Sequence, residues 1–330
     1  MKRILYVLVI VLVALCLNSC GSKQTAENPT LLKTGGSTPV HIAFVTNNVS
    51  DFWKIAEAGV KKGEAEFNAS CDIKMPTQGT AAEQKVILED LVTKGVSGVA
   101  ISPVNPDSQT DVLNKAGEKL SLICMDSDAP KSKRLCYVGT SNLDAGKVAG
   151  EQILKAIPDG GKVMLFVGTL DAQNAADRYK GIQGVLRKNK KFEILGVMTD
   201  DTNHTKARAN VEDTLTKHAD IACLVGLWSY NGPAIVNAVK AAKKVGKVQI
   251  VCFDEQDDTL KGVQSGAIFS TVVQKPYEFG YQSVKVLAAL ARGDKSVIPA
   301  SKIVDTGVSV IDKSNVDSFW TKLKKQTGKS

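Results

Sequence analysis

The sequence has 330 residues, 43% of them hydrophobic, and a formal net charge of +8 at pH 7. A chain of this length exceeds one ordinary hydrophobic core and suits two domains. No stretch combines clustered Lys and Arg with interleaved aromatic residues, which argues against a nucleic-acid-binding protein. The one basic cluster, at residues 322–329, reads as a solvated C-terminal tail.

The first twenty residues are typical of an exported protein. Lys2 and Arg3 precede an apolar run over residues 4–17, which is shorter than the roughly 20 residues of a membrane-spanning helix and fits a secretion signal. The run ends in Leu-Asn-Ser-Cys20, which resembles the bacterial lipoprotein box. The resemblance implies a signal peptide over residues 1–20 and lipid attachment at Cys20. A plain signal peptide cleaved elsewhere is the alternative.

Residues 21–39 are rich in Ser, Thr, Gly, Lys and Asn, a composition that buries too little apolar surface to fold alone. We expect them to form a flexible tether. Five cysteines follow the leader, and three of them, Cys124, Cys223 and Cys252, lie in short apolar runs where cysteine acts as a small hydrophobic residue. No Cys-x-x-Cys or Cys/His spacing is present, so the sequence indicates neither a metal site nor a cofactor.

From residue 40 onward, short β-branched runs alternate with longer segments in which apolar residues recur every three or four positions. Strands are expected at 40–46, 71–75, 97–101, 121–125, 135–138, 162–167, 193–199, 221–226, 248–253, 269–273 and 302–306. Helices are expected at 52–67, 81–94, 107–119, 143–156, 174–189, 205–218, 232–245, 257–264 and 276–292. Repeated strand–helix units with wholly apolar strands predict α/β domains with doubly wound parallel sheets.

Polar residues end many of these apolar strands, and ligands of doubly wound sheets bind at the carboxyl ends of the strands. Acidic and amide side chains dominate, among them Asn47, Asp126, Asp254 and Gln274. Such groups accept and donate the hydrogen bonds that hydroxyl groups make. The pattern therefore indicates a neutral ligand rich in hydroxyl groups.

Several stretches, in this order and spacing, resemble the type I periplasmic sugar-binding proteins. They are His41-Ile-Ala-Phe-Val-Thr, Asp51-Phe-Trp, Gln84, Val96-Ser-Gly-Val-Ala-Ile-Ser-Pro103, Met125-Asp-Ser-Asp-Ala-Pro130, Gly139-Thr-Ser-Asn142 with Gly146, Arg178-Tyr-Lys-Gly181, Val251-Cys-Phe-Asp254 and Val273-Gln-Lys-Pro276. The resemblance implies two doubly wound domains joined by a three-segment hinge. One lobe would comprise 40–141 with 275–304, and the other 142–274 with 305–330.

The resemblance also implies roles for residues of the first lobe. Phe52 and Trp53 would stack on the apolar face of a sugar, although both could instead pack their helix. Asp126 matches the sugar-binding aspartate of the family. Ribose-binding proteins have an arginine next, where this chain has Ser127 and then Asp128, a sequence closer to the subgroup that binds rhamnose or the furanosyl autoinducer. If the segment is extended, Asp126 and Asp128 share a face and both reach the cleft; a loop-capping role for Asp128 is the alternative.

In the second lobe, Asp254 and Gln274 align with family contacts, and Arg178 binds the ligand or anchors its helix. Asn174 lies one helical turn before Arg178 on the same face. Trp228 or Tyr230, with Asn231, occupies a loop in which the family has a contact. The complete candidate set is Asn47, Asp51, Phe52, Trp53, Asp126, Asp128, Asn174, Arg178, Trp228, Asn231, Asp254 and Gln274.

These features predict a monomeric substrate-binding lipoprotein of an ABC-type sugar importer at the cell envelope, with the permease subunits as partners. A sensor that presents a sugar or autoinducer to a chemoreceptor or kinase is the first alternative. A glycosidase that uses Asp126 and Asp128 is the second. No Gly-x-Ser-x-Gly, His-Glu-x-x-His or phosphate-loop motif supports an enzyme.

Overall fold

The computed structural model describes residues 39–328, so the predicted signal peptide, Cys20 and nearly all of the tether lie outside it. The strands are β1 (Val40–Val45), β2 (Ala69–Lys74), β3 (Gly98–Ile101), β4 (Ser121–Met125), β5 (Tyr137–Gly139), β6 (Gly161–Val167), β7 (Phe192–Thr199), β8 (Ile221–Gly226), β9 (Gln249–Phe253), β10 (Ser270–Val273), β11 (Ile303–Asp305) and β12 (Ser309–Asp312). The helices are α1 (Asp51–Phe67), α2 (Ala81–Thr93), α3 (Pro106–Gly117), α4 (Asn142–Ala156), α5 (Gln173–Leu186), α6 (His204–Lys217), α7 (Asn231–Ala241), α8 (Asp257–Ser265), α9 (Pro276–Ala291) and α10 (Val316–Thr327).

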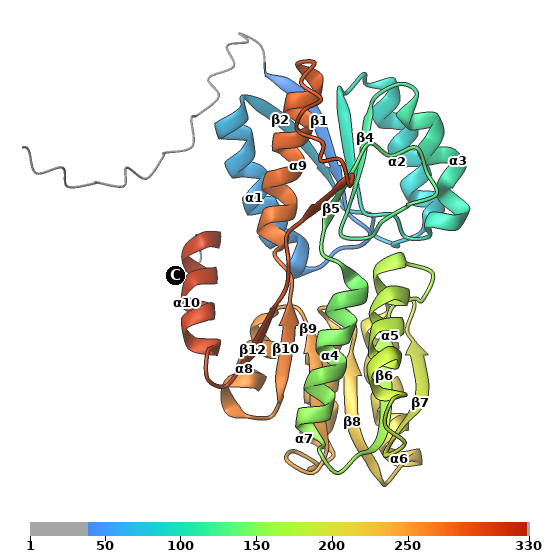
Figure 1. Cartoon of the computed structure of the whole chain (residues 1–330), viewed down its shortest axis with the longest axis vertical. Helices are drawn as coiled ribbons and strands as arrows, with labels where there is room; N and C mark the ends of the chain where they lie inside the picture. The colour runs from blue at the N-terminus through green and yellow to red at the C-terminus, as the bar shows by residue number, and fades with distance from the viewer. Residues whose placement is uncertain (1–38, 329–330) are drawn as a thin grey trace, which may run out of the picture. The chain divides into compact units, whose positions relative to one another are not determined.

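The strands form two six-stranded sheets, ordered β11-β5-β4-β3-β1-β2 and β12-β10-β9-β8-β6-β7. Every pairing between these strands is parallel except that of β10 with β12. We call the first sheet with α1, α2, α3 and α9 the first lobe, and the second sheet with the remaining helices the second lobe (Figure 1). The predicted α/β class with two doubly wound parallel sheets is confirmed.

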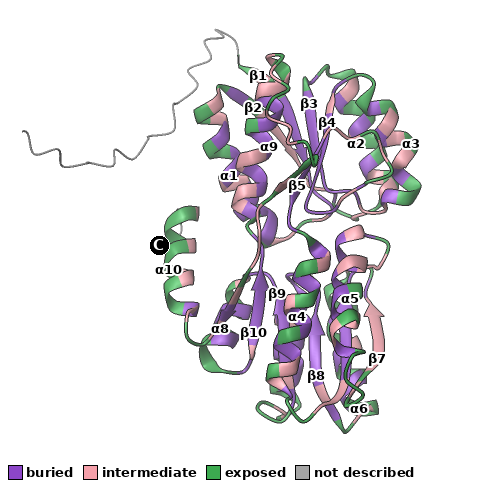
Figure 2. Cartoon of the chain, in the orientation of Figure 1, coloured by how far each residue is buried: buried purple, intermediate pink, exposed green. Residues whose placement is uncertain are grey.

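The centre of each sheet is buried on both faces, which explains why its central strands are almost wholly apolar. In the first lobe, α1 and α9 cover one face and α2 and α3 the other. In the second lobe, α4 and α5 cover one face, and α6, α7 and α8 cover the other. Figure 2 shows the central strands of both sheets as buried.

The chain passes between the two sheets three times: from β5 to α4, from β10 to α9, and from β11 to β12. The first and third passages touch, because the Thr140 hydroxyl donates to the carbonyl of Gly307 at 3.2 Å. Across residues 39–328, no helix has the length and apolar character needed to cross a membrane. All five cysteines in this range are unpaired.

The C-terminal end differs from the expectation. The single strand expected at 302–306 is followed by a second, β12, and the lysine-rich tail forms the helix α10 instead of a solvated extension. Phe319, Trp320 and Leu323 on α10 pack against the apolar core beneath α8. The helix forms because these three residues lie on one apolar face, which packs against the core. The lysines that stand among them in the sequence make this face hard to recognise from charge alone.

Helices α4 and α5 pack closely because glycines lie at their contact. A Cβ atom on Gly146 would lie 2.2 Å from the carbonyl oxygen of Arg178, and one on Gly181 would lie 2.3 Å from that of Leu143. Neither backbone atom can move without displacing a helix. The contact matters for the site, because α5 carries Arg178 and Asn174 into the space between the lobes.

We therefore expect Gly181→Ala to lower the free energy of unfolding by about 1 to 3 kcal/mol through overpacking. Gly184→Ala is the matched control on the same helix, because Gly184 is exposed and a Cβ there meets nothing within 4 Å. That control should be neutral or stabilising, since Gly costs about 0.5 to 1 kcal/mol relative to Ala inside a helix. Urea unfolding followed by circular dichroism measures both, and equal effects would contradict the close-packing explanation.

Candidate functional site

Asp126 and Asp254 occupy equivalent positions, one directly after β4 in the first lobe and one directly after β9 in the second. Both adopt left-handed backbone conformations, with φ of 60° at Asp126 and 69° at Asp254. Asp tolerates this region better than most residues, and non-glycine residues held there concentrate at functional sites. The turn ends each strand, and both carboxylates line the space between the lobes.

Side chains from both lobes bind the Asp126 carboxylate. Its Oδ2 accepts from the Ser102 hydroxyl at 2.8 Å and from the Asn47 amide at 3.4 Å, both in the first lobe. The same oxygen accepts from the Asn174 amide of the second lobe at 3.0 Å. Because one acceptor receives donors from both lobes, Asp126 links the two lobes by hydrogen bonds.

Arg178 lines the cleft and is 1% exposed. Its Nε donates to the Asn142 amide oxygen at 2.9 Å, and Nη1 donates to the carbonyl of Leu227 at 2.6 Å. The guanidinium stacks on Phe253 and lies 3.9 Å from the Asp254 carboxylate. Its buried Nη2 has no partner within the described residues, which leaves one donor for a ligand.

Aromatic rings complete the cleft. The Trp53 indole donates to Asn47 at 3.2 Å, and the Trp228 indole donates to Asn174 at 3.3 Å. Each indole N–H thus donates to the side-chain amide of an asparagine that itself donates to Asp126. These hydrogen bonds fix the orientation of the two rings. Phe52 contacts both Trp53 and Phe279 and lines the cleft as well, so it serves the core and the cleft together.

The cleft brings together eight predicted residues: Asn47, Phe52, Trp53, Asp126, Asn174, Arg178, Trp228 and Asp254. Asn48, Ser50, Ser229 and Tyr230 line it too. The space between them, including the part open to solvent, is about 290 Å³.

The expectation that Asp128 reaches the cleft is wrong. Its Oδ2 accepts from Arg134 Nη2 at 2.6 Å, its Oδ1 accepts from Arg134 Nε, and Asp128 is absent from the cleft lining. The prediction assumed extended backbone, in which residues two apart share a face. The left-handed turn at Asp126 breaks that alternation and turns Asp128 toward the β4–β5 connection.

Three further candidates lie beside the cleft and not in its lining. Asp51 is mostly exposed and pairs with Lys54 at 2.8 Å. The Asn231 amide donates to Asp200 at 3.2 Å, and its oxygen accepts from the Trp228 backbone, so it supports the loop that carries Trp228. Gln274 donates to Asp254 Oδ1 at 3.0 Å and orients that carboxylate.

The structure also identifies supporting residues outside the predicted set. Gln84 is fully buried, and its amide donates to the carbonyls of Thr46 and Ser102, both at 2.8 Å, which joins the ends of β1 and β3. Tyr230 donates to Asp200, the residue after β7. The position of Asp200 at the end of an apolar strand was a signal in the sequence; the partners of Gln84 were not visible there.

The cleft contains two buried carboxylates and one guanidinium. Burial raises the pKa of Asp126 to about 6, although Arg178 and the hydrogen bond from Ser102 act in the opposite direction. Burial likewise raises the pKa of Asp254, which Arg178 and Gln274 lower in part. An ionised carboxylate at this buried position is therefore undersolvated, and groups that donate hydrogen bonds would stabilise it.

Residues 42–295 match the family model of the periplasmic binding protein domain. The chain belongs to this family. This periplasmic binding protein is 26% identical over 258 residues to the ribose import binding protein RbsB of Salmonella typhimurium, covering 77% of this chain and 86% of the relative. It is 24% identical to the D-allose-binding periplasmic protein of Escherichia coli, covering 82% and 91%.

Solved structures agree with this assignment. The ABC transporter solute-binding protein of Burkholderia graminis in complex with D-arabinose has a TM-score of 0.81 and 29% identity, covering 86% of this chain and 99% of that one. The XylFII–LytSN complex has a TM-score of 0.78 and 26% identity, covering 84% and 98%.

Together these findings establish a type I periplasmic sugar-binding protein that acts in the cell envelope. The relatives are sugar-binding transport proteins and not enzymes, so the prediction of a binding protein without catalytic activity is confirmed.

The raised pKa of Asp126 gives a testable dependence of stability on pH. The unfolded chain ionises this carboxyl near pH 3.8 and the folded protein near pH 6, so ionisation in the fold costs stability as pH rises between these values. Asp126→Asn removes that cost and tolerates the left-handed backbone. In the ligand-free periplasmic binding protein we expect it to raise the free energy of unfolding by about 2 to 3 kcal/mol at pH 8 and by almost nothing at pH 4.

Urea unfolding at several pH values measures the difference between wild type and variant. Asp159→Asn is the control, because Asp159 lies exposed in a surface turn. A gain at Asp126→Asn that stays constant from pH 4 to pH 8 would contradict the assignment.

Proposed function

We propose that this protein is the substrate-binding lipoprotein of an ABC-type sugar importer, which binds a monosaccharide in the cleft and closes around it. The observation that carries the proposal is the convergence of Asp126 and Trp53 from the first lobe with Asp254, Arg178 and Trp228 from the second. Flat rings and charged hydrogen-bonding groups around one small cleft match a molecule that has both apolar faces and hydroxyl edges.

The polar atoms of Asp126, Asp254 and Arg178 that accept or donate no hydrogen bond within the described residues each have a role in this proposal. The Asp126 Oδ2 atom already accepts three hydrogen bonds, which leaves Oδ1 for a sugar hydroxyl. Asp254 Oδ1 accepts from Gln274, which leaves Oδ2 for a second hydroxyl. The free Nη2 of Arg178 would donate to a hydroxyl or ring oxygen. The ligand would thus receive one donor and meet two carboxylate acceptors.

The lobes would move about the three passages between the sheets, with 40–141 and 275–304 moving against 142–274 and 305–330. Only the closed form offers the ligand contacts from both lobes at once, so binding would shift the population toward that form. The hydrogen bond from Asn174 to Asp126 supports this proposal, because through it the two lobes lie within hydrogen-bonding distance of each other. The permease would then recognise the closed form.

The names of the relatives support an importer, since they include a ribose import binding protein and an ABC transporter solute-binding protein. A sensor is the second candidate, because XylFII, a structural relative, was solved in complex with LytSN. A test is co-purification of the tagged full-length protein from its own cells. Permease subunits in the eluate favour the importer, whereas a kinase or chemoreceptor favours the sensor.

The relatives named for ribose, allose and arabinose define the sugars to test first. Ribose-binding proteins have an arginine at the position that Ser127 occupies in this chain. Ribose is therefore one sugar of the panel and not the assumed ligand. A thermal-shift screen of pentoses, hexoses and deoxyhexoses identifies the ligand, because a bound ligand raises the melting temperature.

With the best sugar from that screen, we expect Asp254→Asn to weaken binding by about 10- to 100-fold, since each hydrogen bond to a charged group contributes roughly 1.5 to 3 kcal/mol. Asp128→Asn should change affinity by less than about 2-fold, because its carboxylate binds Arg134 away from the cleft. Isothermal titration calorimetry measures both. Unchanged affinity in Asp254→Asn, with the variant folded, would place the sugar elsewhere.

Lipid attachment at Cys20 gives a separate prediction. Expressed in a bacterial host with labelled palmitate, the wild-type protein should incorporate label and partition with membranes, whereas Cys20→Ala should do neither. Cys16→Ala is the control, because Cys16 lies inside the apolar run of the leader. Labelling that persists in Cys20→Ala would disprove the anchor without affecting the sugar site.

A further inference from the structure

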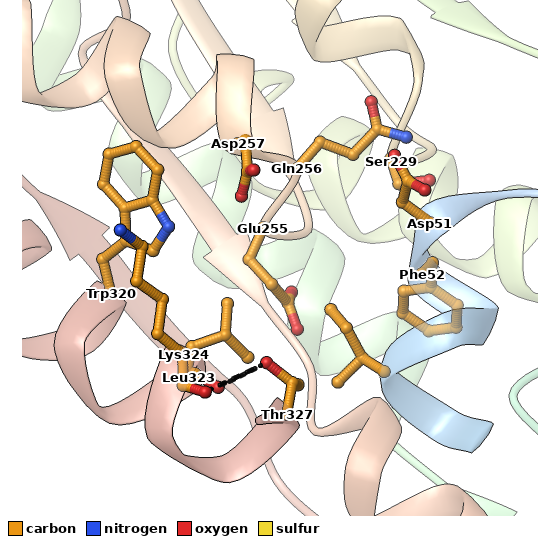
Figure 3. A pocket seen from close by; sticks show the side chains of 11 residues that line it. Asp51, Phe52, Ser229, Glu255, Gln256, Asp257, Trp320, Leu323, Lys324 and Thr327 are labelled. Carbon is orange, nitrogen blue, oxygen red and sulfur yellow. Dashed lines mark hydrogen bonds between the residues drawn. The ribbon is translucent and has the colours of Figure 1, made fainter. Parts of the chain in front are cut away.

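A second cavity lies beside the sugar cleft, between α1, the turn that joins β9 to α8, and α10 (Figure 3). Asp51 and Phe52 of the first lobe form one wall, and Glu255 and Trp320 of the second lobe form the others. Its volume, including space open to solvent, is about 460 Å³. Of the residues that line the sugar cleft, Phe52 and Ser229 also line this cavity, whereas Asp126, Arg178, Trp228 and Asp254 do not.

Glu255 is the unusual residue of this cavity. It is 4% exposed, and its buried Oε2 has no hydrogen-bond partner within residues 39–328. Figure 3 shows its carboxyl group directed into the space between Thr327 and Phe52. A buried carboxyl without a partner is costly, so a group that donates hydrogen bonds or carries positive charge would be favoured at this point.

The other walls also suit a cation. The Lys324 ammonium lies 5.2 Å from the centre of the Trp320 ring, so this wall already holds a cation on an aromatic face. Asp51 and Asp257 add carboxylates to the lining, and Lys324 is its one cation within the described residues. Lys324 forms an ion pair with none of these carboxylates in the described part of the chain.

We propose that this cavity binds a small primary amine, with the ammonium group on Glu255 and the hydrocarbon part against Trp320. A primary ammonium carries three N–H donors and can satisfy the unpartnered Oε2. A quaternary ammonium has no donor, and a neutral alcohol has no charge, so both fit the cavity less well. The amine class follows from this requirement for charge and donors together.

Protonation of Glu255 provides an independent signature. Burial, and then the neighbouring Asp254 carboxylate, raise the pKa of Glu255 well above its usual value. The other charged groups facing the cavity are Asp51, Asp257 and Lys324. An ammonium placed on Glu255 favours the carboxylate, so binding lowers the pKa of Glu255 and releases protons at those pH values where the free protein holds Glu255 protonated.

The experiment uses the mature protein without sugar and n-butylamine hydrochloride as the probe, with tetramethylammonium chloride and n-butanol as comparisons. Calorimetry in two buffers of different ionisation heat, repeated at several pH values, should show saturable binding of butylamine, with a proton release that disappears as the pH rises. Binding of the comparisons should be much weaker. Glu255→Gln should weaken butylamine binding by about 10-fold or more. Asp258→Asn, which removes an exposed carboxylate from the same turn, should leave it unchanged.

Two further variants make the test independent of the folding of Glu255→Gln. Trp320→Leu should weaken butylamine binding, and Lys324→Met should strengthen it by removing the resident cation from the ring. No saturable binding of butylamine, equal binding of butanol, or an affinity unchanged in both Glu255→Gln and Trp320→Leu would overturn the proposal. Because sugar is absent, these outcomes do not depend on the function proposed for the cleft.

Discussion

The carboxylate of Asp126 is the group on which the arrangement of the cleft depends. It is buried where the lobes meet, and it accepts hydrogen bonds from Ser102 on one side and Asn174 on the other. With Asp254 it forms a pair of buried acids that faces a single buried guanidinium, that of Arg178. The fold thus tolerates an excess of negative charge at its centre. Such a centre lowers stability when empty and becomes favourable when a ligand supplies donors, as is common at functional sites.

Much of the fold was predictable because parallel sheets covered on both faces leave a clear pattern. Their strands are continuous apolar runs, and the helices between them keep a period near 3.6. The C-terminal helix α10 was missed for a physical reason. Its apolar residues are only four, Val316, Phe319, Trp320 and Leu323, and they stand among polar residues and lysines. They have a core to pack against only because β12 places them beside α8. Long-range packing of this kind is not encoded locally.

The candidate site was predictable where a residue ends a strand, because parallel strands end at one edge of the sheet. Asp126 and Asp254 follow this rule. The prediction failed just after the strand end, where the direction of a side chain depends on the backbone dihedral angles of the turn. The positive φ of Asp126 turns Asp128 away from the cleft to Arg134, and no sequence period reveals such a turn. Gln274 illustrates a second limit, because its spacing cannot show that it bonds Asp254.

The two cavities share part of their lining. Phe52 and Ser229 line both of them, one from each lobe, and Glu255 directly follows Asp254. In the closure proposed above, an occupant of either cavity would contact both lobes only in the closed form, so each occupant would favour the form in which the other binds. Linkage then requires that the two affinities rise by the same factor. One hinge would thus join an acidic, amine-selective cavity to the sugar cleft, with Phe52 and Ser229 as the shared wall between them.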